Sequence, residues 1–152
     1  MKDCIFCKIA DGAAPAHIVW EDTAHMAFLT PFPNTEGFTV VITKEHHPSY
    51  IADVSRDVRE GLINAACAVA KQIDRSFEDV GRTGIMFEGF GVNHIHAKLF
   101  PMHGTHSDVW KKRASKEHKY FETYEGYISS HDAPAADEEA LKATAKKIRA
   151  AH

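Results

Sequence analysis

The feature that most restricts how this chain can fold is the alternation of residue types in HIHAKLF, residues 94–100. Side chains in a β-strand point alternately to opposite faces of the sheet. As a strand, this stretch carries His94, His96 and Lys98 on one face, and Ile95, Ala97 and Leu99 on the other. The apolar face must be covered by another layer, whereas the polar face borders a cleft or solvent.

A long helix is predicted to supply that layer. From about residue 53 to residue 77, apolar residues recur every three or four positions, as in an amphipathic helix. The stripe consists of Val58, Leu62, Ala66, Val69, Ile73 and Phe77. We expect this helix to lie over the apolar face of the strand. Cys67 falls within the same pattern, and we expect it to pack in the core.

Short strands are predicted around this helix. The candidates are a hairpin formed by residues 17–21 and 25–29, a buried strand over 38–44, and strands over 84–87 and 94–100. A loop rich in proline covers residues 31–37, and a final helix is predicted over 137–149. This order favours the α+β class, with a central, mainly antiparallel sheet, one long helix and a C-terminal helix.

Composition narrows the possible functions. The 152 residues carry a formal net charge of -3, which argues against a nucleic-acid coat or a membrane-surface peptide. No apolar stretch approaches the roughly 20 residues that span a bilayer, and the start does not resemble a signal peptide. We therefore expect a cytoplasmic protein. Residues 111–119 are basic, and form either a solvated face or a phosphate-contacting patch.

The cysteines and histidines predict a metal site. Cys4 and Cys7 form a C-x-x-C pair, and the chain contains 11 histidines. Two thiolates with two imidazoles are a common tetrahedral zinc set. From the residues alone, His94 and either His46 or His47 complete the set, joining the N-terminus to the sheet. The alternative is a surface C-x-x-C with unrelated histidines.

Several motifs in order resemble the histidine triad (HIT) superfamily. They are CIFCKIADG, VWED, AFL and GFTVVITKEH, then Gly89, Val92 and Asn93, and the strand HIHAKLF, within residues 3–103. The resemblance implies an α+β fold, often homodimeric, and nucleotidyl hydrolysis or transfer through a covalent nucleotidyl-histidine. His96 matches the nucleophile. The zinc-bearing branch has ligands at Cys4, Cys7, His46 and His94, which selects His46. We assign residues 1–110 to a HIT domain and 111–152 to an extension packed on it.

The chain departs from the family pattern at the site. Lys98 replaces the third histidine; a lysine with a pKa near its usual value of about 10.4 is a poor general acid at neutral pH. On this basis we expect polyphosphate leaving groups to be favoured over amines, unless His103 or His106 donates a proton. Thr30 stands where the family commonly has a ribose-binding aspartate, and MFEGFG replaces the usual lead-in to the signature.

These motifs predict a nucleotide hydrolase or nucleotidyl transferase that releases an AMP-like product and holds structural zinc. The predicted catalytic residues are His96 and Lys98. The candidate nucleotide-binding residues are Phe28, Thr30, Ile42, Gly89 and Gly91, although core packing is an alternative for Phe28 and Ile42. One alternative function is a catalytically weak nucleotide-binding scaffold that keeps the fold and zinc. Another is a zinc-dependent RNA-binding module that uses residues 111–119.

Overall fold

The computed structural model describes residues 3–107, 109–112, 115–124, 126 and 139. The chain divides into two compact units, Met1–Asp108 and Val109–His152, and the site lies in the first. Nearly all of the predicted helix over 137–149 lies outside the described residues. The packing of residues 111–152 on the first domain stays a prediction.

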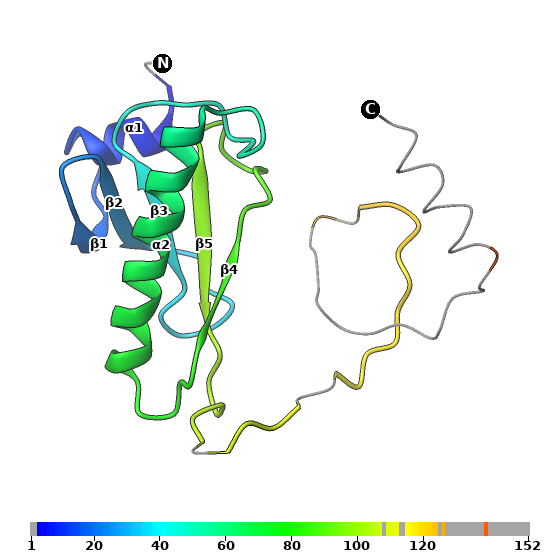
Figure 1. Cartoon of the computed structure of the whole chain (residues 1–152). Coiled ribbons are helices and arrows are strands. Elements are labelled where there is room, and N and C mark those ends of the chain that lie inside the picture. Colours follow the sequence, from blue (N-terminus) through cyan, green and yellow to red (C-terminus); the bar gives the residue numbers. More distant parts are fainter. Residues whose placement is uncertain (1–2, 108, 113–114, 125, 127–138, 140–152) are drawn as a thin grey trace. The chain divides into compact units, whose positions relative to one another are not determined.

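A five-stranded antiparallel sheet forms the centre of the first unit, in the order β1-β2-β3-β5-β4 (Figure 1). The strands are β1 (His17–Glu21), β2 (His25–Leu29), β3 (Thr39–Thr43), β4 (Thr83–Met86) and β5 (His96–Pro101). The helices are α1 (Ile5–Ala10) and α2 (Arg56–Ser76). The α+β fold class is therefore confirmed. None of the described helices is long and apolar enough to cross a membrane.

The turn between β1 and β2 is held by one carboxylate. The Asp22 side chain accepts hydrogen bonds from the backbone N–H groups of Ala24 and His25, at 2.8 and 2.6 Å, and from the His25 ring. An aspartate that binds the backbone two or three residues ahead is a common way to close such a turn. Burial alone would raise the pKa of Asp22, but these hydrogen bonds hold it below its usual value.

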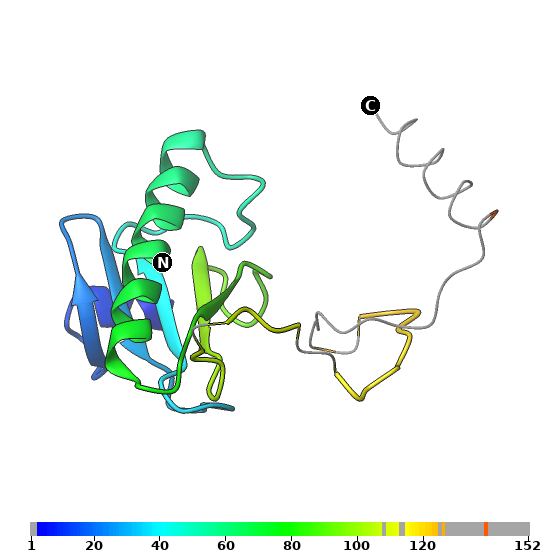
Figure 2. The same ribbon diagram turned by 60° about the horizontal axis from the view of Figure 1, so that its bottom comes forward.

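Helix α2 packs on one face of the sheet, as its stripe predicts (Figure 2). Its buried residues contact a core that includes Ile95, Ala97 and Leu99 of the predicted apolar face, all fully buried. The Ser55 side chain caps the helix by accepting a hydrogen bond from the N–H of Val58. The helix buries Leu62, Ala65, Ala66, Val69, Ala70 and Ile73.

The prediction that Cys67 packs in the core is wrong, because its side chain is exposed. Successive residues of an α-helix are rotated by about 100°. Cys67 directly follows the fully buried Ala66, so it points away from the stripe that faces the sheet.

The opposite face of the sheet is covered only in part by α1. A second core cluster there contains Ile9 of α1 together with Met26, Phe28, Val40 and Ile42 of β2 and β3. The rest of this face carries His96 and Lys98 of β5. The strand begins two residues later than predicted: the N–H of Ile95 bonds to the carbonyl of His47, outside the ladder between β3 and β5.

Adjacent residues on α2 test this packing. We expect Leu62→Ala to lower the free energy of unfolding by about 2–5 kcal/mol, because Leu62 is fully buried and its loss leaves a cavity. Ile63→Ala is the control, since Ile63 is 40% exposed and should change the free energy far less. Urea denaturation measures both variants. Equal losses would show that α2 does not face the sheet as described.

Candidate functional site

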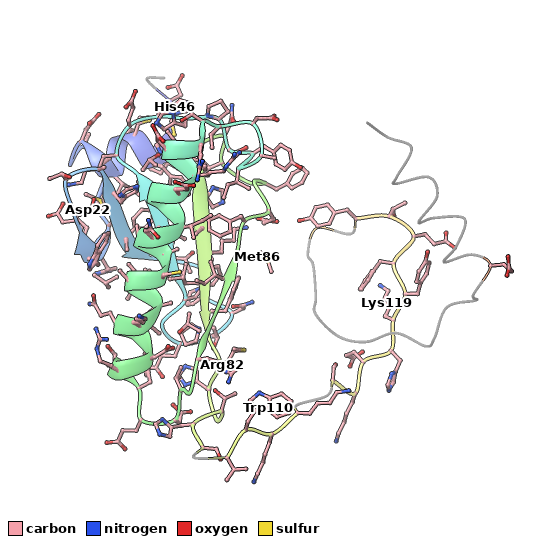
Figure 3. All side chains as sticks on the ribbon, in the orientation of Figure 1. Asp22, His46, Arg82, Met86, Trp110 and Lys119 are labelled. Carbon is pink, nitrogen blue, oxygen red and sulfur yellow. The ribbon has the colours of Figure 1, made fainter. Side chains whose placement is uncertain are left out.

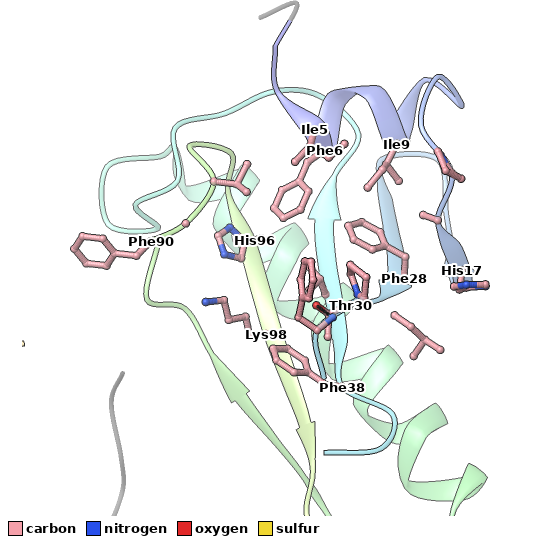
Figure 4. Close-up of a pocket in the computed structure, with 18 residues that line it drawn as sticks. Ile5, Phe6, Ile9, His17, Phe28, Thr30, Phe38, Phe90, His96 and Lys98 are labelled. Atoms are coloured by element: carbon pink, nitrogen blue, oxygen red, sulfur yellow. Dashed lines mark hydrogen bonds between the residues drawn. The ribbon is translucent and has the colours of Figure 1, made fainter. Parts of the chain in front are cut away.

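His96 occupies the first position of β5, on the face opposite α2. It is only 3% exposed, and the ring of Phe6 on α1 packs edge-on against it at a centroid distance of 5.4 Å. Lys98 lies two residues further along the same strand. Figure 4 shows the side chains of both residues at a pocket between α1, β2 and the loop that carries Phe90.

One hydrogen bond determines which nitrogen of His96 is free. Nδ1 lies 2.7 Å from the carbonyl oxygen of His94. A carbonyl oxygen can only accept, so Nδ1 carries the proton and the neutral ring keeps its lone pair on Nε2. Burial lowers the pKa of His96, and the charge of Lys98 lowers it further, while this hydrogen bond and Glu88 oppose the shift. His96 is therefore a neutral imidazole near pH 7 with Nε2 available as a nucleophile.

The pocket has a volume of about 710 Å³, within the range of small-molecule sites. Its lining is mostly apolar and rich in phenylalanine, with Phe6, Phe28, Phe32, Phe38 and Phe90. The side chains of His17, Thr30, His96 and Lys98 supply polar groups. This arrangement suits a ligand with a flat apolar part and one polar, charged end.

The structure brings together some of the candidate nucleotide-binding residues. Phe28, Thr30 and Gly91 line the pocket. Ile42 is fully buried in the second core cluster and does not line the pocket, so its packing role prevails over base contact. Gly89 also lies outside the lining. It has a φ of 74°, and a Cβ there would lie 3.1 Å from the carbonyl oxygen of Ser49, so glycine allows this loop to pack closely.

Four donors from distant parts of the chain meet beside the pocket. The ligand atoms of Cys4, Cys7, His46 and His94 all lie within 4.8 Å of one another. Nδ1 of His94 is 3.5 Å from both sulfur atoms, and Nδ1 of His46 is 3.3 Å from Sγ of Cys7. Figure 3 labels His46, one of these four residues.

These positions fit a tetrahedral zinc ion. Zn–S bonds of about 2.3 Å and Zn–N bonds of about 2.0 Å at tetrahedral angles separate neighbouring donors by roughly 3.5 Å. Nε2 of His94 lies 2.8 Å from the carbonyl oxygen of Thr43, to which it donates, so the Nδ1 lone pair is directed at the thiols. His47 is outside the cluster, with Nε2 3.9 Å from a carboxylate oxygen of Glu45.

Comparison with known proteins identifies the family. The model of the HIT domain matches residues 11–105. The chain belongs to the HIT domain family. An uncharacterized HIT-like protein from Methanocaldococcus jannaschii is 30% identical over 120 residues, covering 71% of this chain and 85% of its own.

Two further proteins extend this comparison. The crystal structure of a HIT family member from Bacillus subtilis superposes with a TM-score of 0.67 at 26% identity, covering 99% of this chain and 97% of its own. Adenosine 5'-monophosphoramidase hnt1 from Schizosaccharomyces pombe is 30% identical over 101 residues, covering 64% of this chain and 73% of its own.

Glu88 is a residue of this HIT domain that the sequence patterns did not single out. Its carboxylate forms an ion pair with the ammonium group of Lys98. The register between β4 and β5 reveals it. Met86 pairs with Lys98, and the strands are antiparallel, so this register, when continued, places position 88 opposite His96. The side chain of Glu88 is only 9% exposed, and that of Lys98 is 27% exposed.

His103, one predicted source of a proton, is engaged elsewhere in the HIT domain. Its Nδ1 lies 3.0 Å from a carboxylate oxygen of Asp79, and its Nε2 lies 3.0 Å from the carbonyl of Glu36. Both partners accept, so both nitrogens donate, and the hydrogen bonds to Glu36 and Asp79 raise the pKa of His103. Neither His103 nor His106 lines the pocket, so neither supplies the missing third histidine in this structure.

The cysteines provide a matched test of the metal site. We expect purified protein to contain about one zinc per chain, and Cys7→Ser to lose it, since thiolates bind zinc far better than hydroxyls. Because structural zinc contributes on the order of 10 kcal/mol in small peptides, a chelator should lower the thermal unfolding midpoint by roughly 10 °C or more.

Cys67→Ser is the control, because Cys67 is exposed and outside the cluster. It should keep both the zinc and the unfolding midpoint. Elemental analysis and calorimetry measure these quantities. Native protein without zinc, or equal metal loss in both variants, would contradict the assignment.

Proposed function

We propose that this HIT-domain protein is a nucleotide hydrolase or nucleotidyl transferase in which Nε2 of His96 attacks the α-phosphorus. The main observation in support is the hydrogen bond from Nδ1 of His96 to the carbonyl of His94, which leaves the Nε2 lone pair free at the pocket. The phosphoramidase among its relatives acts in the same broad class of chemistry. The proposed substrates are nucleoside phosphoramidates or dinucleoside polyphosphates.

The proposed reaction has two displacements. In the first, the Nε2 lone pair forms a bond to the α-phosphorus, and the bond to the leaving group breaks with its electron pair going to that group. In the second, water attacks the phosphorus, the P–N bond breaks, and its electron pair returns to Nε2. One water proton passes to solvent, and a nucleoside monophosphate is released. An amine leaving group takes its proton from solvent as its bond breaks in the first step, whereas a polyphosphate leaves as an anion. Another acceptor in place of water makes the protein a transferase.

The two halves of the pocket have different roles in this proposal. The nucleoside lies against the aromatic half, where Phe28 and Phe38 provide apolar surface. Thr30 lines the pocket and would offer the ribose one hydroxyl, whose oxygen accepts a hydrogen bond from the N–H of Phe32 at 3.3 Å. The α-phosphate lies at His96, where the positive charge of Lys98 stabilises the transition state.

Zinc at the four-donor cluster has a structural role in this proposal. Cys4, Cys7, His46 and His94 would occupy all four positions of a tetrahedral ion, so no position would be open for substrate. A bound cation lowers the pKa of its thiol ligands, opposing the burial that raises the pKa of Cys7. Holding the His94 side chain also fixes its backbone carbonyl, which orients His96. The metal would therefore support the nucleophile without touching the phosphate.

A nucleotide-binding scaffold with weak catalysis is the second candidate. The Lys98–Glu88 ion pair favours it, because a lysine held by a carboxylate is less available to a phosphate. Thr30 favours it too, since a neutral hydroxyl binds ribose hydroxyls less strongly than a carboxylate does. Turnover separates the two candidates, because a scaffold binds nucleotides without releasing products.

We also propose a homodimer, as the family resemblance implies. In the described part of the chain, β4 is an edge strand of the sheet and pairs with β5 on one side only. Ile85 of this edge strand is 38% exposed. Paired edges and buried apolar side chains are common in symmetric dimers.

Replacing His96 tests the proposed function. We expect His96→Ala to reduce kcat for adenosine phosphoramidate hydrolysis by at least about 10³-fold, because it removes the nucleophile. Zinc content and the far-ultraviolet circular dichroism spectrum should stay unchanged, since Nε2 of His96 is not a metal donor. The rate of AMP release is measured by chromatography.

His106→Ala is the matched control, since this histidine lies outside the pocket and the metal cluster. It should keep the full rate. A His96→Ala protein that retains more than about a tenth of the wild-type rate would overturn the nucleophile assignment.

A further inference from the structure

An internal ion pair partly offsets the positive charge that Lys98 brings to the pocket. Lys98 is the one lysine or arginine among the described residues that line the pocket, and its ammonium group pairs with the carboxylate of Glu88. Glu88 is more buried than Lys98 and is not part of the lining, so it acts on a ligand in the pocket mainly through its pairing with Lys98. A ligand that reaches Lys98 therefore meets a lysine whose charge is already partly compensated.

The Glu88 end of the ion pair belongs to the segment between β4 and β5. Figure 4 shows Ile9, Phe28 and Phe38 on one side of His96 and Lys98, and Phe90 on the other. The apolar side suits the nucleoside. The opposite side is bordered by the segment between β4 and β5, which carries both Phe90 and Glu88. With the nucleoside on the apolar side, the group displaced from the α-phosphate would depart toward this segment.

We propose that Glu88 determines specificity by disfavouring leaving groups that carry several negative charges. Its carboxylate neutralises Lys98 and repels anions at the exit side of the pocket. Both effects grow with the number of charges on the ligand, because Coulomb energies add. The inference rests on the proposed function, since it assumes that an α-phosphate binds at His96. Lys98 alone predicts a preference for polyphosphates, and Glu88 reverses that expectation.

The test compares two substrates that share an adenylyl group and need little proton donation. The p-nitrophenyl ester of AMP releases a phenolate with a single charge, whereas diadenosine tetraphosphate releases a chain with several. Their ratio of kcat/KM therefore reports leaving-group charge with little contribution from general acid catalysis. We expect wild type to prefer the ester.

Glu88→Gln removes the charge but keeps the size and one hydrogen-bonding oxygen. We expect this variant to raise kcat/KM for the tetraphosphate relative to the ester by about tenfold at low salt, with a smaller change at high salt because ions screen the interaction. Glu88→Asp keeps the charge and should keep the wild-type ratio. Glu21→Gln is the matched control, because Glu21 pairs with Lys44 at 3.0 Å and neither residue lines the pocket.

Each other outcome has a definite meaning. An unchanged ratio in Glu88→Gln, an equal shift in Glu88→Asp, or a shift independent of salt would overturn the role of Glu88. If His96→Ala turned over these substrates as fast as wild type, the proposed function would be overturned instead. If wild type turns over neither substrate, dissociation constants decide the inference: Glu88→Gln should tighten ATP binding more than AMP binding. Equal tightening would refute the charge effect.

Discussion

The hydrogen bond from Nδ1 of His96 to the carbonyl of His94 is the interaction on which the proposed chemistry depends. It joins residues 94 and 96 and fixes the tautomer of the His96 ring, with the proton on Nδ1. The side chain of His94 is in turn fixed by the carbonyl of Thr43 on β3 and lies beside two thiols. A chain of contacts thus runs from the candidate metal cluster to Nε2 of His96, the proposed nucleophile.

The fold explains why one donor of the cluster, His94, and the proposed nucleophile, His96, stand two residues apart. Residues 95, 97 and 99 anchor the stretch under α2 and are fully buried. This packing leaves the intervening residues on the face that α1 covers in part. His94 lies beside the N-terminal thiols of Cys4 and Cys7, and His96, two residues further along, lines the pocket. Disrupting the apolar side would therefore displace both His94 of the candidate metal cluster and His96.

Much of this arrangement could be predicted from the sequence. The period of two in HIHAKLF indicated the faces, and the stripe after residue 53 indicated α2. The hairpin has the predicted bounds, because Asp22 closes a short turn between two regular strands. The choice of His46 over His47 required the family resemblance, since adjacent residues in a loop have no fixed periodicity.

Other features depended on three-dimensional contacts that no local pattern contains. Cys67 belongs to the helix but not to its buried stripe, and Ile42 faces the second cluster without reaching the pocket. Glu88 was missed because its role depends on which residues of β5 it lies beside. That requires the register between β4 and β5, which the sequence does not give. These differences concern the pocket more than the fold, since ligand sites combine side chains from separate elements.

The account is tested most directly by mass spectrometry of protein quenched in acid-free denaturant during turnover of an adenylyl substrate. It predicts a nucleoside monophosphate adduct whose fragment spectrum places the modification on His96, as a covalent intermediate requires. An adduct on another residue would contradict the central claim. So would rapid single-turnover product release with no adduct at any quench time.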